Sequence, residues 1–187
     1  MGYVFEPDAL HAIARRAVGL PFEEMCATVI AGCAEAWPRH VEQRPNWVFN
    51  LAGGACGIMT VIHGSLSEYV ILFGTPVGTN AFSGRYRLDI WDCVLSGTMK
   101  TYTEEQFDRA VVSEPGEMAV LRRGQVKGFS LSEDCWLLEY GRGPVPTSLR
   151  VALFGDTLFS AQDVPTIVKT VRVYGRQVVR NLLRGKI

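Results

Sequence analysis

The fold of this chain is decided by one stretch, LSEYVILFG at residues 66–74. This stretch predicts a buried strand, because β-branched and aromatic residues run without interruption until a glycine ends them. Alternate residues of a strand share a face, so Tyr69, Ile71 and Phe73 point one way and the residues between them point the other. A phenol therefore shares a face with large apolar side chains, as in the wall of an apolar chamber.

Two further predicted strands each carry one acid on an apolar face. In residues 84–97, Asp92 shares its face with aliphatic side chains such as Ile90. In residues 135–140, Glu139 occupies a similarly apolar face just before a Gly-Arg-Gly turn. Burying an ionised carboxylate is costly unless the group is paired or protonated. We therefore expect an apolar chamber that holds two acids.

Each acid also has a purely structural explanation. Asp92 and Glu139 could be core carboxylates bonded to backbone N–H groups or to Arg142. Two such acids near a buried phenol favour a functional interpretation, because groups with perturbed pKa values cluster at active sites.

Composition excludes several other classes of protein. The 187 residues and the 48% hydrophobic fraction suit one domain with a sizeable core. Basic and acidic residues balance at 19 each, so no overall field attracts nucleic acid. Five dispersed cysteines do not form a disulfide framework, and three isolated histidines do not predict a metal site. No signal peptide and no membrane-spanning apolar run is present.

The chain divides into three regions of different periodicity, which together form a single α+β domain over residues 1–187. Helical spacing of apolar residues runs over about residues 7–37. Short β segments separated by glycine and proline turns follow over about 47–146, a pattern typical of a small barrel or jelly roll. Helical spacing returns over about 147–185, where Ser160–Asp163 resembles a capping box before the last helix.

The last helix is predicted to be basic and amphipathic. Its basic side chains lie within about 120° of one another on a helical projection: Lys169, Arg172, Arg176, Arg180 and Arg184. Its apolar side chains lie on the opposite side: Ile167, Val171, Tyr174, Val178 and Leu182. Such a helix can lie flat in a membrane interface. It can also pack on the core with a solvated basic face, or carry an RNA-binding stripe, although no aromatic interleaving favours RNA.

Residues 63–75, HGSLSEYVILFGT, resemble the His-Ala-Ser-x-Ser-Glu-Tyr-x-x-Leu-Phe-Gly-Thr signature of fungal C-8 sterol isomerases and the related sigma non-opioid receptor. Similar matches extend over essentially the whole chain, at residues 47–54, 83–86, 138–143, 156–160 and 175–186. The C-terminal match is nearer to the isomerases than to the receptor.

The resemblance implies a cupin-like β-barrel of jelly-roll type that carries no metal or other cofactor. It also implies two C-terminal amphipathic helices packed below the barrel against a membrane, and a homotrimer. The protein would be peripheral on the endoplasmic reticulum membrane or another membrane surface, or soluble if naturally without an anchor. The family's N-terminal transmembrane helix has no counterpart here. Ala55 and Leu131 stand where the receptor has tryptophans, so the chamber's shape is expected to differ.

The same resemblance assigns roles to individual residues. Glu139 matches the glutamate that contacts the ligand, Asp92 its partner aspartate, and Tyr69 the tyrosine that hydrogen-bonds the glutamate. Glu68 matches a structural glutamate, and we expect a structural role for His63 too. Further contacts with the substrate are expected from side chains of the chamber wall: Phe73, Ile71, Met59, Ile90, Leu149, Ala152 and Tyr174.

The function implied is a sterol C-8 isomerase that shifts the double bond from the 8 to the 7 position. An acid protonates carbon 9, a cation forms at carbon 8, and a base removes a proton from carbon 7. Asp92 and Glu139 would form that pair, and the sequence does not say which one gives the proton. Two alternatives use the same acids: a non-catalytic binder of lipophilic amines or sterols, and a diverged isomerase or cyclase of another terpenoid.

Overall fold

The computed structural model describes residues 2–186, and the side chains of residues 150–154 lie outside the described part. The chain begins with two helices, α1 (Pro7–Arg16) and α2 (Phe22–Ala36). The strands follow: β1 (Val48–Ala52), β2 (Ala55–Gly64), β3 (Glu68–Thr75), β4 (Thr79–Phe82), β5 (Asp89–Ser96), β6 (Met99–Thr103), β7 (Gln106–Ser113), β8 (Met118–Leu121), β9 (Gly128–Leu131) and β10 (Cys135–Arg142). The chain ends with α3 (Pro146–Leu149), the π-helical segment η1 (Arg150–Ser160) and α4 (Val164–Leu183).

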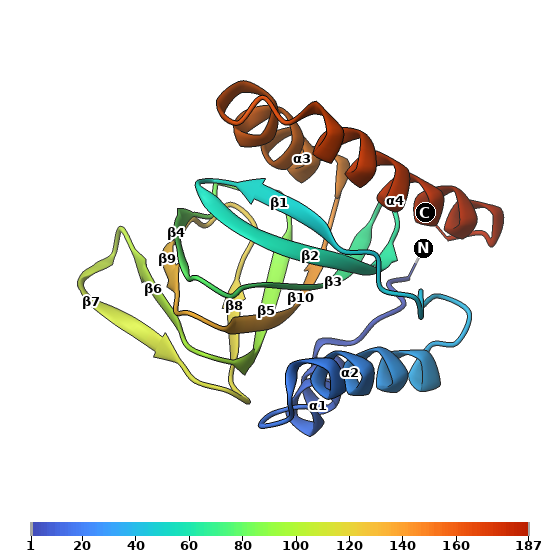
Figure 1. Ribbon diagram of the computed structural model, residues 1–187, viewed down its shortest axis with the longest axis horizontal. Coiled ribbons are helices and arrows are strands. Elements are labelled where there is room, and N and C mark those ends of the chain that lie inside the picture. The colour runs from blue at the N-terminus through green and yellow to red at the C-terminus, as the bar shows by residue number, and fades with distance from the viewer. Residues whose placement is uncertain (1, 187) are drawn as a thin grey trace.

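The strands form two antiparallel sheets that lie between the N-terminal and C-terminal helices (Figure 1). The larger sheet has six strands in the order β1-β2-β3-β10-β5-β8, and the smaller has four in the order β4-β9-β6-β7. The predicted α+β fold with a cupin-like arrangement of strands is therefore confirmed. Within residues 2–186 the strands pair as two separate sheets rather than as one closed barrel.

The two faces of the larger sheet have different partners. Val70 and Leu72 of β3 point to the outer face, where they join one apolar cluster with Val29 of α2. Ile71 and Phe73 point inward and belong to a second apolar cluster. The alternation predicted for residues 66–74 is correct, and buried residues of α2 pack with the outer face of the sheet.

Two boundaries differ from the sequence-based expectation. The strand expected over residues 84–97 spans only Asp89–Ser96, because Gly84 has a left-handed conformation with φ of 76° and the chain bends at residues 87–88 before it becomes extended. The last helix is capped by Asp163 rather than by Ser160. The Asp163 carboxylate accepts a hydrogen bond of 3.1 Å from the backbone N–H of Thr166.

Helix α4 packs on the larger sheet through a polar face. Its buried residues are Thr170, Tyr174, Gln177 and Asn181. Three of them donate side-chain hydrogen bonds to backbone carbonyls at the end of β2 and just beyond it: Tyr174 to Ser65, Gln177 to Val61 and Asn181 to Gly64, at 2.7, 2.7 and 2.9 Å. The pairing register between β2 and β3 shifts between Val61 and His63. The side chains of α4 therefore donate to carbonyls beside an irregular part of the strand pairing.

Tyr174 fits the interpretation in which the last helix packs on the core. It lies on the apolar side expected for this helix and is buried against the strands. Other apolar residues of α4 remain half or more exposed instead: Val164, Val168, Val171 and Val179. No helix of residues 2–186 combines the length and the hydropathy needed to span a bilayer.

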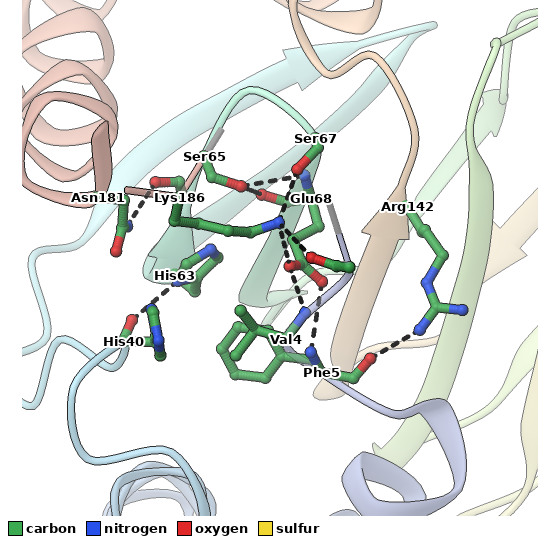
Figure 2. A network of polar contacts seen from close by, with 12 residues as sticks. Val4, Phe5, His40, His63, Ser65, Ser67, Glu68, Arg142, Asn181 and Lys186 are labelled. Carbon is green, nitrogen blue, oxygen red and sulfur yellow. Dashed lines mark hydrogen bonds and ion pairs between the residues drawn. The ribbon is translucent and has the colours of Figure 1, made fainter. Parts of the chain in front are cut away.

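A buried network around Glu68 ties the two ends of the chain to the sheet (Figure 2). The Glu68 carboxylate has no exposed surface and accepts a 2.7 Å hydrogen bond from the backbone N–H of Val4. The Tyr140 hydroxyl donates to it at 2.7 Å, and the Lys186 ammonium lies 2.9 Å away. Burial alone would raise the pKa of Glu68, but Lys186, Tyr140 and Val4 outweigh it and hold that pKa below its usual value.

His63 lies beside this network and is fully buried (Figure 2). Its Nδ1 atom lies 2.8 Å from the carbonyl oxygen of His40, and its ring packs against Phe5 with centroids 4.7 Å apart. Burial lowers the pKa of His63 to about 4, so the imidazole is neutral near neutral pH.

Replacing Lys186 with methionine should destabilise the protein by about 3 kcal/mol, because the substitution leaves a buried carboxylate without its cation. Glu68 has a depressed pKa, so its contribution to stability is present above the unfolded pKa and lost as the pH falls. The variant should therefore lose less stability on acidification. Urea unfolding between neutral and acidic pH measures both effects, and Lys100→Met, at an exposed position, is the control. Equal unfolding free energies for the two variants would contradict the interpretation.

Candidate active site

A cavity of about 150 Å³ lies on the inner face of the larger sheet, and its wall is mainly apolar. The structure brings most of the predicted contact residues to this wall: Met59, Ile71, Phe73, Ile90, Leu149 and Tyr174. Tyr69, Asp92 and Glu139 line it as well. The side chain of Ala152 lies outside the described residues. Glu68 and His63 are not among the described residues of this wall.

The two acids face each other across adjacent strands. Asp92 of β5 is the direct register partner of Glu139 of β10. Directly opposite residues of an antiparallel pair have Cβ atoms about 4.5–5.5 Å apart and point to the same face. Both side chains therefore point into the cavity from the same face of two adjacent strands. Asp92 is almost completely buried.

Tyr69 reaches Glu139 diagonally from β3. Its hydroxyl donates a 2.5 Å hydrogen bond to Glu139 Oε1. The residue directly opposite Tyr69 on β10 is Gly141, and a Cβ atom there would collide with the tyrosine ring. The glycine thus gives the phenol the space it needs to lie across β10 and meet the carboxylate.

The environment of Glu139 favours its protonated form. Burial and, secondarily, the nearby charge of Asp92 raise the pKa of Glu139 to about 7. The hydrogen bond from Tyr69 and the charge of Lys127 act in the opposite direction and limit this rise. Near neutral pH a substantial share of the protein therefore carries a neutral carboxylic acid in the cavity.

Asp92 has a partner that sequence reasoning missed. Lys127 Nζ lies 2.6 Å from Asp92 Oδ2, and both side chains are buried in the cavity wall. Lys127 comes just before β9, after a turn that contains two arginines, so its sequence context resembles a solvated basic loop. The only indication of such a partner in the sequence was indirect: a carboxylate on an apolar strand face requires a cation or a proton.

The alternative partner considered for these acids, Arg142, lies elsewhere. Its guanidinium donates to the carbonyl of Phe5 at 2.7 Å and to the Tyr140 hydroxyl at 2.9 Å. Successive residues of β10 point to opposite faces, so Tyr140 and Arg142 face away from Glu139. Among the described residues, no three His, Cys, Asp or Glu side chains converge in a way that could hold a metal ion.

The cavity is smaller than the roughly 300–1,000 Å³ typical of small-molecule sites. A bulky ligand therefore requires part of the wall to move. Strands form most of that wall, and helical segments complete it through residues such as Leu149 of α3 and Tyr174 of α4. Ala55 lines the cavity, whereas Leu131 is buried in the surrounding core and is absent from the described wall.

A family model described as "ERG2 and Sigma1 receptor like protein" matches residues 1–186. The chain belongs to this family. The C-8 sterol isomerase erg2 of Aspergillus fumigatus is 38% identical over 188 residues, which cover 98% of this chain and 78% of that protein. The sigma non-opioid intracellular receptor 1 of Gallus gallus is 39% identical over 174 residues, covering 92% of this chain and 78% of the receptor.

Solved structures with a similar arrangement of strands include two cupins. The cupin domain of Schizosaccharomyces pombe Cnp3 gives a TM-score of 0.42 at 11% identity, covering 56% of this chain and 70% of that chain. A cupin from Shewanella frigidimarina gives 0.43 at 11% identity, covering 55% of this chain and 86% of that chain.

Replacing Tyr69 with phenylalanine should raise the pKa of Glu139 further above about 7, by roughly one unit, because the hydrogen bond to the carboxylate favours its ionised form. Carbon-13 NMR titration of labelled glutamate carboxyl groups measures this shift, and Glu139→Gln identifies the signal. Tyr86→Phe changes another tyrosine of the same wall and should shift the pKa less. An unchanged midpoint in Tyr69→Phe would show that the hydrogen bond does not control the carboxyl group.

Proposed function

We propose that this protein is a sterol C-8 isomerase, an enzyme that moves the sterol double bond from the 8 to the 7 position without a redox step. The observation that carries the proposal is the pair of facing carboxyl groups in an apolar cavity, one of which has a pKa raised to about 7. The identity of 38% to a C-8 sterol isomerase over nearly the whole chain supports it independently.

The proposed reaction needs an acid that stays protonated near neutral pH and a base within reach of the same ring. Asp92 and Glu139 meet both requirements as a pair. One gives a proton to carbon 9, a tertiary cation forms at carbon 8, and the other removes a proton from carbon 7. The apolar wall keeps water from trapping the cation, and the ring of Phe73 can face it.

The main alternative is a binding protein without turnover. The receptor relative at 39% identity supports this possibility, because a buried carboxylate can also pair with the ammonium of a lipophilic amine. Such amines imitate the cation of the isomerase reaction, so binding alone does not separate the two functions. A third possibility is that the same acids act on a different terpenoid substrate, because the small side chain of Ala55 in the wall affects the shape of the cavity.

We also propose that the protein associates with a membrane surface, such as that of the endoplasmic reticulum, through α4. Exposed valines at positions 164, 168, 171 and 179 lie beside the basic side chains of the helix. An apolar stripe flanked by arginines is typical of a helix that lies in the membrane interface. This placement would bring the cavity, which α4 helps to close, near a lipid-dissolved substrate.

Self-association, with the trimer that the family resemblance implies, is a further part of the proposal. Strand β7 ends the smaller sheet, and its side chains Phe107, Val111 and Val112 are exposed, with Phe107 at 77%. Terminal strands with exposed apolar side chains readily pair with another chain. A second and third copy of this chain would cover them.

The purified protein should convert an 8-ene sterol into the 7-ene product, detected by mass spectrometry after chromatography. Glu139→Gln and Asp92→Asn should each lower kcat by about 10²–10⁴-fold, since each removes one proton-transfer group. Thermal unfolding establishes that the variants stay folded. Tight binding of an amine together with no conversion by the wild-type protein would favour the receptor-like function, and near-normal turnover in either variant would refute the assignment of the pair.

Substituting Val171 with aspartate should weaken binding to phosphatidylcholine–phosphatidylinositol vesicles by about tenfold or more, because an apolar contact is replaced by a charge. Vesicle co-sedimentation measures the change. Val77→Asp is the matched control, since Val77 is 78% exposed in the turn between β3 and β4. Equal binding by the two variants would exclude this face of α4 as the membrane contact.

A further inference from the structure

We propose that Lys127 sets the direction of proton transfer in the cavity, by keeping Asp92 ionised as the base and leaving Glu139 as the acid. This inference rests on the proposed isomerase function and deepens it. Either of two identical carboxyl groups could act as the acid unless their surroundings differ. Here the ammonium group of Lys127 forms an ion pair with Asp92.

The ion pair with Asp92 is close and secluded. Lys127 Nζ lies 2.6 Å from Asp92 Oδ2, and the two side chains are 10% and 5% exposed. A charge removed from water in this way depends strongly on its partner, so each group holds the other ionised. The ring of Phe129 lies 5.8 Å from the ammonium and adds a weaker cation–π contact.

Hydrogen bonds fix the backbone around Lys127, and the ion pair with Asp92 holds the ammonium in the cavity wall. The backbone N–H of Lys127 donates to Ser83 Oγ at 3.0 Å, and the backbone N–H of Ser83 donates to the carbonyl of Lys127 at 2.9 Å. This reciprocal pair of bonds joins the residue after β4 to the residue before β9. The direction in which the Lys127 side chain leaves the backbone is therefore built into the sheet.

Glu139 has no equivalent cation among the described side chains, whose ion pairs all involve other acids. Tyr69 occupies Oε1, which leaves Oε2 to carry the proton toward the cavity. The titratable groups that face the two acids come from several elements: Tyr69 of β3, Tyr86 before β5, Lys127 before β9 and Tyr174 of α4. Lys127 is the cation of this set.

The proposed step balances in protons and charge. The O–H bond at Glu139 Oε2 breaks as a C–H bond forms at carbon 9, and the positive charge appears at carbon 8. The C–H bond at carbon 7 then breaks, its electrons form the new double bond, and the proton passes to Asp92 Oδ1. The cycle closes when the proton returns from Asp92 to Glu139 across the facing strands.

Lys127 also balances the charge of the intermediate. Before reaction the ammonium and Asp92 cancel and Glu139 is neutral. After protonation of the sterol, two carboxylates face the ammonium and the sterol cation, so the total is still zero. A C–H bond beside a carbocation is strongly acidic, so a paired and therefore weak carboxylate base is sufficient, provided that it is ionised.

The test is the pH dependence of kcat/KM in Lys127→Met, with Lys127→Arg as the conservative variant. The wild-type profile should be bell-shaped, with a rising limb that reports the base and a falling limb that reports loss of the proton from Glu139 above about pH 7. Lys127→Met should move the rising limb to higher pH and lower the rate near neutral pH by about 10–100-fold, while Lys127→Arg keeps the limb in place. Lys100→Met, at an exposed position of β6, is the matched control. A lower rate without movement of the limb would overturn the proposal.

A second measurement does not depend on turnover. Carbon-13 titration of labelled aspartate and glutamate carboxyl groups should show that the proton retained near neutral pH lies on Glu139 in the wild type, and that it is no longer confined to Glu139 in Lys127→Met. A retained proton on Asp92 in the wild type alone would overturn the proposal, even if the methionine variant failed to fold. Absence of sterol conversion by the wild type would refute the proposed function, and this titration would still decide the role of Lys127.

Discussion

The site depends on the electrostatic constraint created when two carboxyl groups enter one apolar cavity. Two facing carboxylates repel each other, and burial penalises the charge of each. The structure resolves the conflict in two ways at once, because Asp92 receives a buried ammonium and Glu139 has a raised pKa. Strand register brings the two acids together, and the absence of a side chain at Gly141 lets Tyr69 reach Glu139.

The larger sheet shows how environment, rather than residue type, decides the state of a glutamate. Glu68 and Tyr69 are consecutive in β3 and point to opposite faces. On the outer face, Glu68 has a cation and several donors, and its pKa is depressed despite complete burial. On the inner face, Glu139 has one phenolic donor and an acid for a neighbour, and its pKa is raised. One sheet thereby carries a structural ion pair on one face and an acid with a raised pKa on the other.

The sequence predicted those parts of the site that lie on regular strands. Period-two alternation placed Tyr69, Asp92 and Glu139 correctly, because a strand fixes the direction of every side chain. Lys127 was missed, because no periodicity relates a loop residue to the face of a distant strand. The buried face of α4 was missed for another reason. Hydropathy patterns assume that apolar residues turn inward, whereas here the adjacent backbone carbonyls accept bonds from polar helix residues such as Gln177.

The same polar packing affects how the cavity can enlarge. Tyr174 lines the cavity and also donates to the carbonyl of Ser65, so moving α4 outward would break a buried hydrogen bond. Segment α3 is attached differently, since the hydroxyl groups of Thr147 and Ser148 bond within their own turn, to Pro144 and Val145. Displacing α3 together with Pro144 and Val145 preserves these local bonds, but it breaks the 3.0 Å hydrogen bond from the backbone N–H of Val145 to the carbonyl of Leu66. Expansion of the small cavity around a bulky ligand therefore costs at least one buried hydrogen bond whether α3 or α4 moves.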